Sequence, residues 1–153
     1  MIEILWLGRG GQGAFTAAKL LGAAYATKEG GHSLAFPSFG PERRGAPVRA
    51  FTKLDSNPIL DRSETEHADY IVILDETLYN SSLLSLLKDG GKVIINAKHS
   101  EDSRIIAFDG DTLAKSLRLP VVNTVMMGAL SGISEIVTVE EMQTAIENYM
   151  PVK

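Results

Sequence analysis

The chain has 153 residues, of which 44% are hydrophobic and 22% charged, a balance typical of a globular protein with one core. Its net charge of -4 argues against broad electrostatic binding to nucleic acid, and no apolar run approaches the about 20 residues that a membrane-spanning helix requires. The absence of cysteine excludes disulfides and cysteine-ligated iron–sulfur clusters within this chain. The sequence opens on a strand-like segment without a basic leader, so we expect a cytoplasmic protein that contacts neither nucleic acid nor membrane.

The first half of the chain alternates between strand-like and helix-like segments. Residues 2–7 are an apolar run of strand formers. Residues 12–28 carry apolar side chains at helical spacing, and Gly30-Gly31 is expected to end this helix. Two further strands are expected at 33–38 and 48–54, on either side of a loop rich in proline and glycine.

The second half continues the alternation. Residues 69–74 predict a strand covered on both faces, and Asp75 stands where it would cap a helix. That helix is expected over 77–88 and is closed by Gly90-Gly91. The remaining predicted elements are strands at 92–96 and 104–108, helices at 111–117 and 123–132, and a C-terminal helix opened by a capping box at 138–141.

Strands that alternate with helices predict an α/β fold of three layers: a mostly parallel, Rossmann-like sheet with helices on both faces. The sequence has no internal repeat, low-complexity tract or linker. We therefore expect a single domain over residues 1–153.

A glycine-rich turn joins the first strand to the first helix. Gly8, Gly10 and Gly13 fit the pattern G-x-G-x-x-G, and Gly11 and Gln12 complete the turn. In this context glycines allow the backbone to approach a ligand closely, and the N–H groups at the helix start favour an anion. The five residues are candidates for cofactor binding. The alternative is that the glycines only let the helix pack tightly on the sheet.

A dinucleotide site would require a second feature that this sequence lacks. Such sites place an acidic residue after the second strand, where it holds the ribose hydroxyls. Here residues 33–38 lead directly into Phe39-Gly40-Pro41, and Glu42 lies farther along, inside the following loop. The pattern therefore argues against NAD.

Arg43 and Arg44 occupy a loop of restricted shape, between Gly40-Pro41 and the segment 45–47. Arginine is suited to bidentate contacts with phosphate or carboxylate. In a doubly wound sheet this loop would leave the carboxyl end of a strand, on the edge where the glycine turn lies and where ligands bind. The two arginines are candidates for binding an anion there. The alternatives are a salt bridge with Glu42 or a contact with a partner subunit, and the subunit contact explains them at least as well as a ligand does.

The order and spacing of these motifs resemble one family. GRGGQGAFTAAKLL, AFPSFGPERRGAPVRAF, NTVMMGALSGI and VTVEEMQTAI are similar to segments of the gamma subunits of 2-oxoacid:ferredoxin oxidoreductases, over essentially the whole chain. The resemblance implies a subunit of an enzyme that oxidatively decarboxylates a 2-oxoacid to acyl-coenzyme A and CO2 and reduces ferredoxin. ERRGAPV is most similar to the pyruvate type, or to the branched-chain type that can share this subunit.

The resemblance also implies how the cofactors are shared out. Thiamine diphosphate and iron–sulfur clusters would belong to the alpha, beta and delta subunits, so this chain is expected to be inactive alone, with no catalytic residue and no metal. Coenzyme A is the cofactor implied for this chain, held between residues 10–13 and the pair Arg43 and Arg44. The alternatives are a free-standing Rossmann-type nucleotide-binding protein and a purely structural assembly module.

Overall fold

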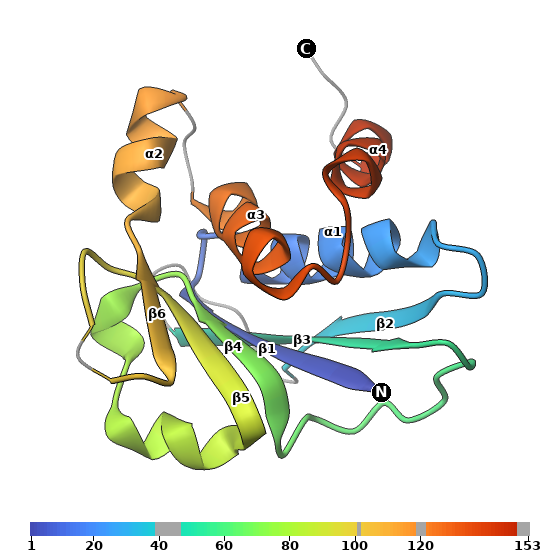
Figure 1. Cartoon of the computed structure of the whole chain (residues 1–153), viewed down its shortest axis with the longest axis horizontal. Helices are drawn as coiled ribbons and strands as arrows, with labels where there is room; N and C mark the ends of the chain where they lie inside the picture. Colours follow the sequence, from blue (N-terminus) through green and yellow to red (C-terminus); the bar gives the residue numbers. More distant parts are fainter. Residues whose placement is uncertain (39–46, 101, 119–121, 150–153) are drawn as a thin grey trace.

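The computed structural model describes residues 1–38, 47–100, 102–118 and 122–149. They form a six-stranded sheet with the order β2-β3-β1-β4-β5-β6 (Figure 1). The strands are β1 (Ile2–Arg9), β2 (His32–Pro37), β3 (Pro47–Asp55), β4 (Ala68–Ile73), β5 (Leu87–Asn96) and β6 (Ile105–Phe108).

The sheet is mostly parallel, as expected. β1, β4, β5 and β6 run in one direction, whereas β3 is antiparallel to both of its neighbours, β1 and β2. β2 therefore also runs in the direction of β1. Only residues 38–46 separate β2 from β3, and a parallel connection needs a crossover of about a dozen residues or more, so β3 can only return antiparallel. As a result, five strands end at the same edge of the sheet.

The α-helices lie on one face of the sheet (Figure 1). Their apolar side chains join Ile4 and Trp6 of β1 in one buried cluster. Trp6 is fully buried and donates its indole N–H to Thr52 Oγ1 at 3.0 Å. The helices are α1 (Ala14–Ala26), α2 (Gly110–Ser116), α3 (Asn123–Ser134) and α4 (Val139–Tyr149).

The opposite face carries a thinner layer. Two 3-10 helices, η1 (Glu76–Leu78) and η2 (Ser81–Leu86), cover it, with Leu83 buried in the second apolar cluster. The prediction of one α-helix over 77–88 is wrong. Asn80 accepts a hydrogen bond from the Ser82 backbone N–H at 3.0 Å, and such local bonds from asparagine compete with continued helix. Helices thus cover both faces, but on this face they are short.

Gly90-Gly91 also has a different role from the one expected. The pair lies inside β5 and does not end a helix. Gly90 has φ 80°, and the register of β4 with β5 shifts between Ala68 and Tyr70. A Cβ on Gly91 would lie 3.1 Å from the Ala68 carbonyl oxygen, so the glycines allow an irregular, close approach of the two strands.

The capping box of α4 is confirmed. Thr138 N–H donates to Glu141 Oε1 at 2.8 Å, and Glu141 N–H donates to Thr138 Oγ1 at 3.1 Å. Lys28, just after α1, also lies 2.7 Å from Glu141 Oε1 and ties the two helices together. Within the described ranges, every helix is too short or too polar to cross a bilayer.

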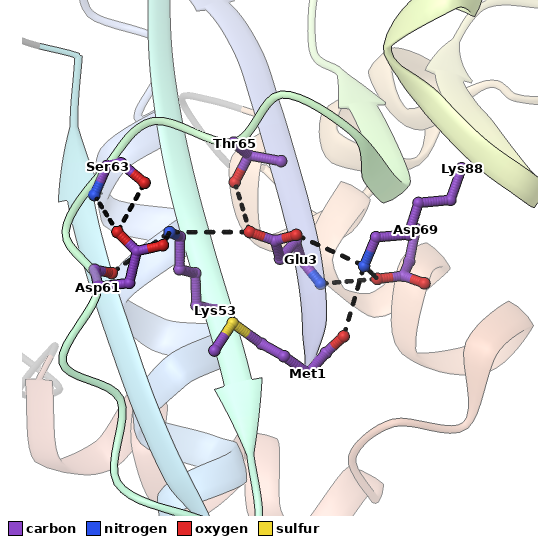
Figure 2. Close-up of polar contacts among 8 residues, drawn as sticks. All are labelled: Met1, Glu3, Lys53, Asp61, Ser63, Thr65, Asp69 and Lys88. Atoms are coloured by element: carbon purple, nitrogen blue, oxygen red, sulfur yellow. Dashed lines mark hydrogen bonds and ion pairs between the residues drawn. The ribbon is translucent and has the colours of Figure 1, made fainter.

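A buried lysine organises the face that lacks α-helices (Figure 2). Lys53 of β3 is 1% exposed, and its Nζ lies 3.7 Å from Glu3 Oε1 and 3.5 Å from Asp61 Oδ2. The other oxygen of Glu3 lies 3.4 Å from Lys88 Nζ, which is 3.0 Å from Asp69. These alternating charges hold the segment after β3 against the sheet, at the edge opposite the glycine turn.

Candidate functional site: the glycine turn at the carboxyl edge of the sheet

The turn between β1 and α1 depends on glycines in the left-handed region. Gly11 has φ 94°, and Gly13, directly before α1, has φ 83°. A Cβ on Gly13 would collide with the side-chain amide of Asn123 in α3, whose Nδ2 lies 3.4 Å from the Gly13 carbonyl oxygen. Gly13 is therefore required for both backbone conformation and close packing. At this position the tight-packing interpretation of the glycines holds, whatever else the turn binds.

Polar side chains brace this turn against the end of β4. Gln12 Oε1 accepts from the Arg9 backbone N–H at 2.7 Å, and Gln12 Nε2 donates to Asp75 Oδ2 at 3.3 Å. Arg9 Nε donates to the same oxygen at 3.2 Å, and another guanidinium nitrogen donates to Thr77 Oγ1 at 2.8 Å. Because its backbone N–H also donates to the Arg9 carbonyl, Gln12 is engaged by the protein itself and positions the turn.

Asp75 is the centre of this brace. Partial burial alone would raise the pKa of Asp75, but hydrogen bonds from Thr77, the charge of Arg9 and the Gln12 amide outweigh burial and hold it below its ordinary value. Its expected role as a helix cap is confirmed, because Oδ1 accepts from the Thr77 backbone N–H at 3.0 Å. Its contact with Arg9 had no sequence signal, since 66 positions separate the two residues.

The first turn of α1 faces the same edge with its backbone donors. The first described intrahelical bond runs from Ala17 N–H to the Gly13 carbonyl at 2.9 Å. Among the described residues, no side chain caps the start of α1. The N–H groups of residues 14–16 therefore point out of the helix end, as in an anion-binding turn.

Arg43 and Arg44 lie outside the described residues. The residues on either side are placed: Pro37 ends β2, and Pro47 begins β3, where it pairs with Arg9 of β1. Both ends of the arginine segment thus lie at the edge that holds the glycine turn, as expected for a strand connection at this position.

A polar cleft of about 500 Å³ lies next to the turn, at the carboxyl ends of β4, β5 and β6. Asn96, 6% exposed, both lines this cleft and caps α2: its Oδ1 accepts from Gly110 N–H at 2.9 Å, and its Nδ2 donates to the Leu74 carbonyl at 3.0 Å. The walls of the cleft come from segments that share no sequence motif. They are Glu76, Asn96, Ala97, Lys98, His99, Asp109, Asp111, Thr112 and Lys115.

Comparison with known proteins decides the family. The profile of the family described as pyruvate ferredoxin/flavodoxin oxidoreductase matches residues 3–153. The chain belongs to this family. Within it the chain is a gamma-type subunit of a multi-subunit 2-oxoacid:ferredoxin oxidoreductase, and is thus part of an oxidoreductase, as its motifs indicated.

Two relatives of the gamma-type subunit illustrate the similarity. It is 43% identical over 158 residues to pyruvate synthase subunit PorC of Methanothermobacter thermautotrophicus, covering 100% of this chain and 87% of the relative. It is 42% identical over 159 residues to the pyruvate/ketoisovalerate oxidoreductases common subunit gamma of Thermococcus kodakarensis, covering 96% and 85%.

Solved structures agree with the fold of the gamma-type subunit. Pyruvate oxidoreductase subunit PORC from Thermotoga maritima matches with a TM-score of 0.79 and 31% identity, over 96% of this chain and 84% of that one. A 2-oxoglutarate:ferredoxin oxidoreductase from Magnetococcus marinus, solved with 2-oxoglutarate, coenzyme A and succinyl-CoA, has a TM-score of 0.72 over 96% of this chain and 26% of that one. At 18% identity, this second match supports the fold alone.

Proposed function

We propose that this gamma-type subunit, a single domain over residues 1–153, contributes the coenzyme A contact of a pyruvate:ferredoxin oxidoreductase. It assembles with alpha, beta and delta subunits. One observation carries the proposal: the uncapped start of α1 and both ends of the arginine segment share the carboxyl edge of the sheet, with Pro47 paired to Arg9. Ligands of open α/β sheets bind along this edge.

Phosphate groups account for the composition of this edge. Gly10, Gly11 and Gly13 let the backbone approach a diphosphate, and the N–H groups at the start of α1 donate to its oxygens. Arg9 is ion-paired with Asp75 and serves the brace, so the positive charge that phosphate requires must come from elsewhere. Arg43 and Arg44 supply it from the neighbouring segment, as bidentate donors.

The chemistry of the reaction lies in the partner subunits. When bound there, thiamine diphosphate supplies the decarboxylation step and iron–sulfur clusters carry the electrons. The absence of cysteine from this chain agrees with that division. The chain's own residues bind and orient coenzyme A. Pyruvate as the substrate rests on the ERRGAPV segment and on relatives named as pyruvate synthase subunits.

The test is the coenzyme A dependence of the assembled complex. In the variant Arg43→Ala/Arg44→Ala, we expect KM for coenzyme A to rise by about tenfold or more, with KM for pyruvate unchanged, because each lost charged contact costs about 1.5–3 kcal/mol. Arg104→Ala is the matched control: Arg104 is ion-paired with Asp102 just before β6, at the opposite edge. Equal coenzyme A dependence in the three enzymes would contradict the proposal.

An apolar groove favours a second, structural role in assembly. It has a volume of about 510 Å³ and lies between α2 and α3. Leu113, Leu117 and Ile133 line it and are 39%, 57% and 40% exposed. If assembly is the chain's sole contribution, Leu117→Ser would reduce co-purification with the partner subunits, while Arg43→Ala/Arg44→Ala would leave coenzyme A dependence unchanged.

A further inference from the structure

The segment that joins β3 to β4 is longer than the connection requires. The end of β3 and the start of β4 lie at the same edge of the sheet, on either side of β1, so two strand spacings of about 10 Å in all separate them. About three or four extended residues would span that distance. The β3–β4 segment, residues 56–67, has twelve, and within the described range 47–100 it contains neither helix nor strand. Irregular connections of about this length are uncommon in compact domains and often carry function.

Polar contacts with the sheet fix the main chain of the β3–β4 segment directly after Leu60 (Figure 2). The Asp61 carbonyl oxygen accepts a hydrogen bond from Lys53 Nζ at 3.2 Å, and the Asp61 carboxylate lies 3.5 Å from the same nitrogen. Asp61 Oδ1 also accepts from the Ser63 backbone N–H at 2.9 Å. The segment is therefore irregular in conformation but bound to a buried group of β3.

This arrangement buries a lysine and exposes a leucine. Lys53 is 1% exposed, whereas Leu60 is 90% exposed, the highest value among the large hydrophobic side chains of the described ranges. Folding alone favours the reverse, because burial stabilises an apolar side chain and destabilises a charged one. Single exposed leucines are common on protein surfaces, but this one is presented by a main chain that a buried lysine holds in place. Such local departures from the usual pattern are expected at functional positions.

The charges around Leu60 indicate the kind of surface that it fits. Asp55 ends β3, Glu66 precedes β4 and Asp89 lies near the start of β5, so three carboxylates share the amino edge of the sheet with the β3–β4 segment. Arg62 is the cation that the segment itself contributes. A surface complementary to this edge has an apolar pocket for the leucine and lysine or arginine at the rim of that pocket.

We infer that Leu60 is an anchor for a partner subunit of the oxidoreductase, and that it enters an apolar pocket with a basic rim on that subunit. A side chain presented by a fixed main chain loses little conformational freedom on binding, which favours this role. The amino edge lies opposite the glycine turn, so a subunit bound there leaves the carboxyl edge accessible. The inference rests on the chain's place in a multi-subunit enzyme and does not depend on the coenzyme A contact.

The experiment measures the rate at which the gamma-type subunit, carrying a fluorescent label, exchanges out of the assembled complex. In Leu60→Ser we expect this rate to rise by about tenfold or more, because loss of an anchor acts mainly on dissociation. Leu60→Met nearly preserves the volume and should remain within about threefold of the intact complex. Val139→Ser is the matched control, since Val139 is 64% exposed at the start of α4 and should leave the rate unchanged. Neither serine variant should lower the thermal midpoint, because both side chains are exposed.

A second measurement tests the basic rim. In Glu66→Gln we expect association of the subunit with its partners to slow by about twofold at low salt, and to depend less on added salt than in the intact chain. An unchanged association rate would overturn the basic rim and with it the stated kind of partner.

Three results would overturn the anchor itself. The first is exchange of Leu60→Ser at the rate of the intact complex, and the second is equal acceleration by Val139→Ser. The third is a dimer of the isolated chain that Leu60→Ser abolishes, because a second copy would then receive the leucine. None of these results bears on the coenzyme A contact, which Arg43→Ala/Arg44→Ala tests separately.

Discussion

Arg9 and Asp75 form an ion pair, with Nε 3.2 Å from Oδ2, that joins the glycine turn after β1 to the end of β4. Gln12 Nε2 donates to the same carboxylate oxygen at 3.3 Å, so one acidic side chain accepts hydrogen bonds from both Arg9 and Gln12. The strands β1 and β4 are direct neighbours. The brace therefore fixes the turn at the end of β1. On one side of β1 the sheet continues with β3 and β2, and on the other side with β4, β5 and β6. Ligands of open α/β sheets usually bind at such a point.

Removal of the brace should loosen the turn more than it disturbs the core. For Asp75→Ala we expect a loss of roughly 1–2 kcal/mol in the free energy of unfolding, measured by urea titration, because partly exposed charged hydrogen bonds contribute in that range. Asp75→Asn keeps an acceptor for Thr77 and should lose less. The control is Asp102→Asn, where an exposed pair with Arg104 is removed. Equal effects of Asp75→Ala and Asp102→Asn would contradict the brace.

Acid should weaken the fold through Asp75 and Glu141. Burial alone would raise each pKa, but hydrogen bonds and positive neighbours lower the pKa of Asp75 below 3.8 and that of Glu141 below 4.5. A lowered folded-state pKa contributes stability that is fully present above the unfolded value and is lost as pH falls through the folded value. We expect the urea midpoint to hold from pH 7 to about 5 and to fall below about pH 4, less steeply in Asp75→Asn. A midpoint that rises on acidification would contradict this sign.

The sequence predicted elements whose signals are local. The glycine turn, the cap at Asp75 and the capping box at 138–141 depend on neighbouring residues, and all three are in place. The helix over 77–88 failed because its leucine spacing suggested α-helix while Asn80 formed a competing local bond. The spacing of leucines indicates which side chains are buried, and α-helices and 3-10 helices bury leucines in a similar way.

Features that depend on long-range pairing were not predictable in this way. The antiparallel course of β3 follows from the short connection to β2, but its pairing with β1 joins segments far apart in the chain. The contact of Arg9 with Asp75 and the buried position of Lys53 likewise appear only once the strand order is known. Lysine in a strand usually indicates a solvent-facing position, and here the carboxylates of Glu3 in β1 and Asp61 in the segment after β3 make burial tolerable.

Gly13 should tolerate substitution least among the glycines of the turn. For Gly13→Ala we expect a loss of roughly 1–2 kcal/mol from the left-handed backbone, and more from the collision with Asn123. Asn123→Ala in the same chain should recover the second part. Gly128→Ala is the matched control: it lies in α3 with no atom within 4 Å of its added Cβ, so it should stabilise by about 0.5–1 kcal/mol. Thermal unfolding of the three variants measures these differences, and equal behaviour of Gly13→Ala and Gly128→Ala would contradict the prediction.

The network around Lys53 predicts unequal roles for its two carboxylates (Figure 2). The Glu3 side chain is 20% exposed and touches both Lys53 and Lys88, whereas that of Asp61 is 64% exposed. Glu3→Gln should therefore cost about 2–3 kcal/mol, and Asp61→Asn clearly less, because the Asp61 carboxylate is exposed to solvent. In the double variant Glu3→Gln/Lys53→Met, the loss should be smaller than the sum of the single losses, because neither charge is left buried alone. Additive losses would show that the two residues are not coupled.

Hydrogen exchange on the assembled complex, with and without coenzyme A, tests the ligand edge most directly. We expect coenzyme A to slow exchange of the backbone amides at residues 10–16, the glycine turn and the first turn of α1, with no change in the segment from 56 to 67 at the opposite edge. Unchanged exchange at residues 10–16 under saturating coenzyme A would contradict the placement of the ligand at this turn.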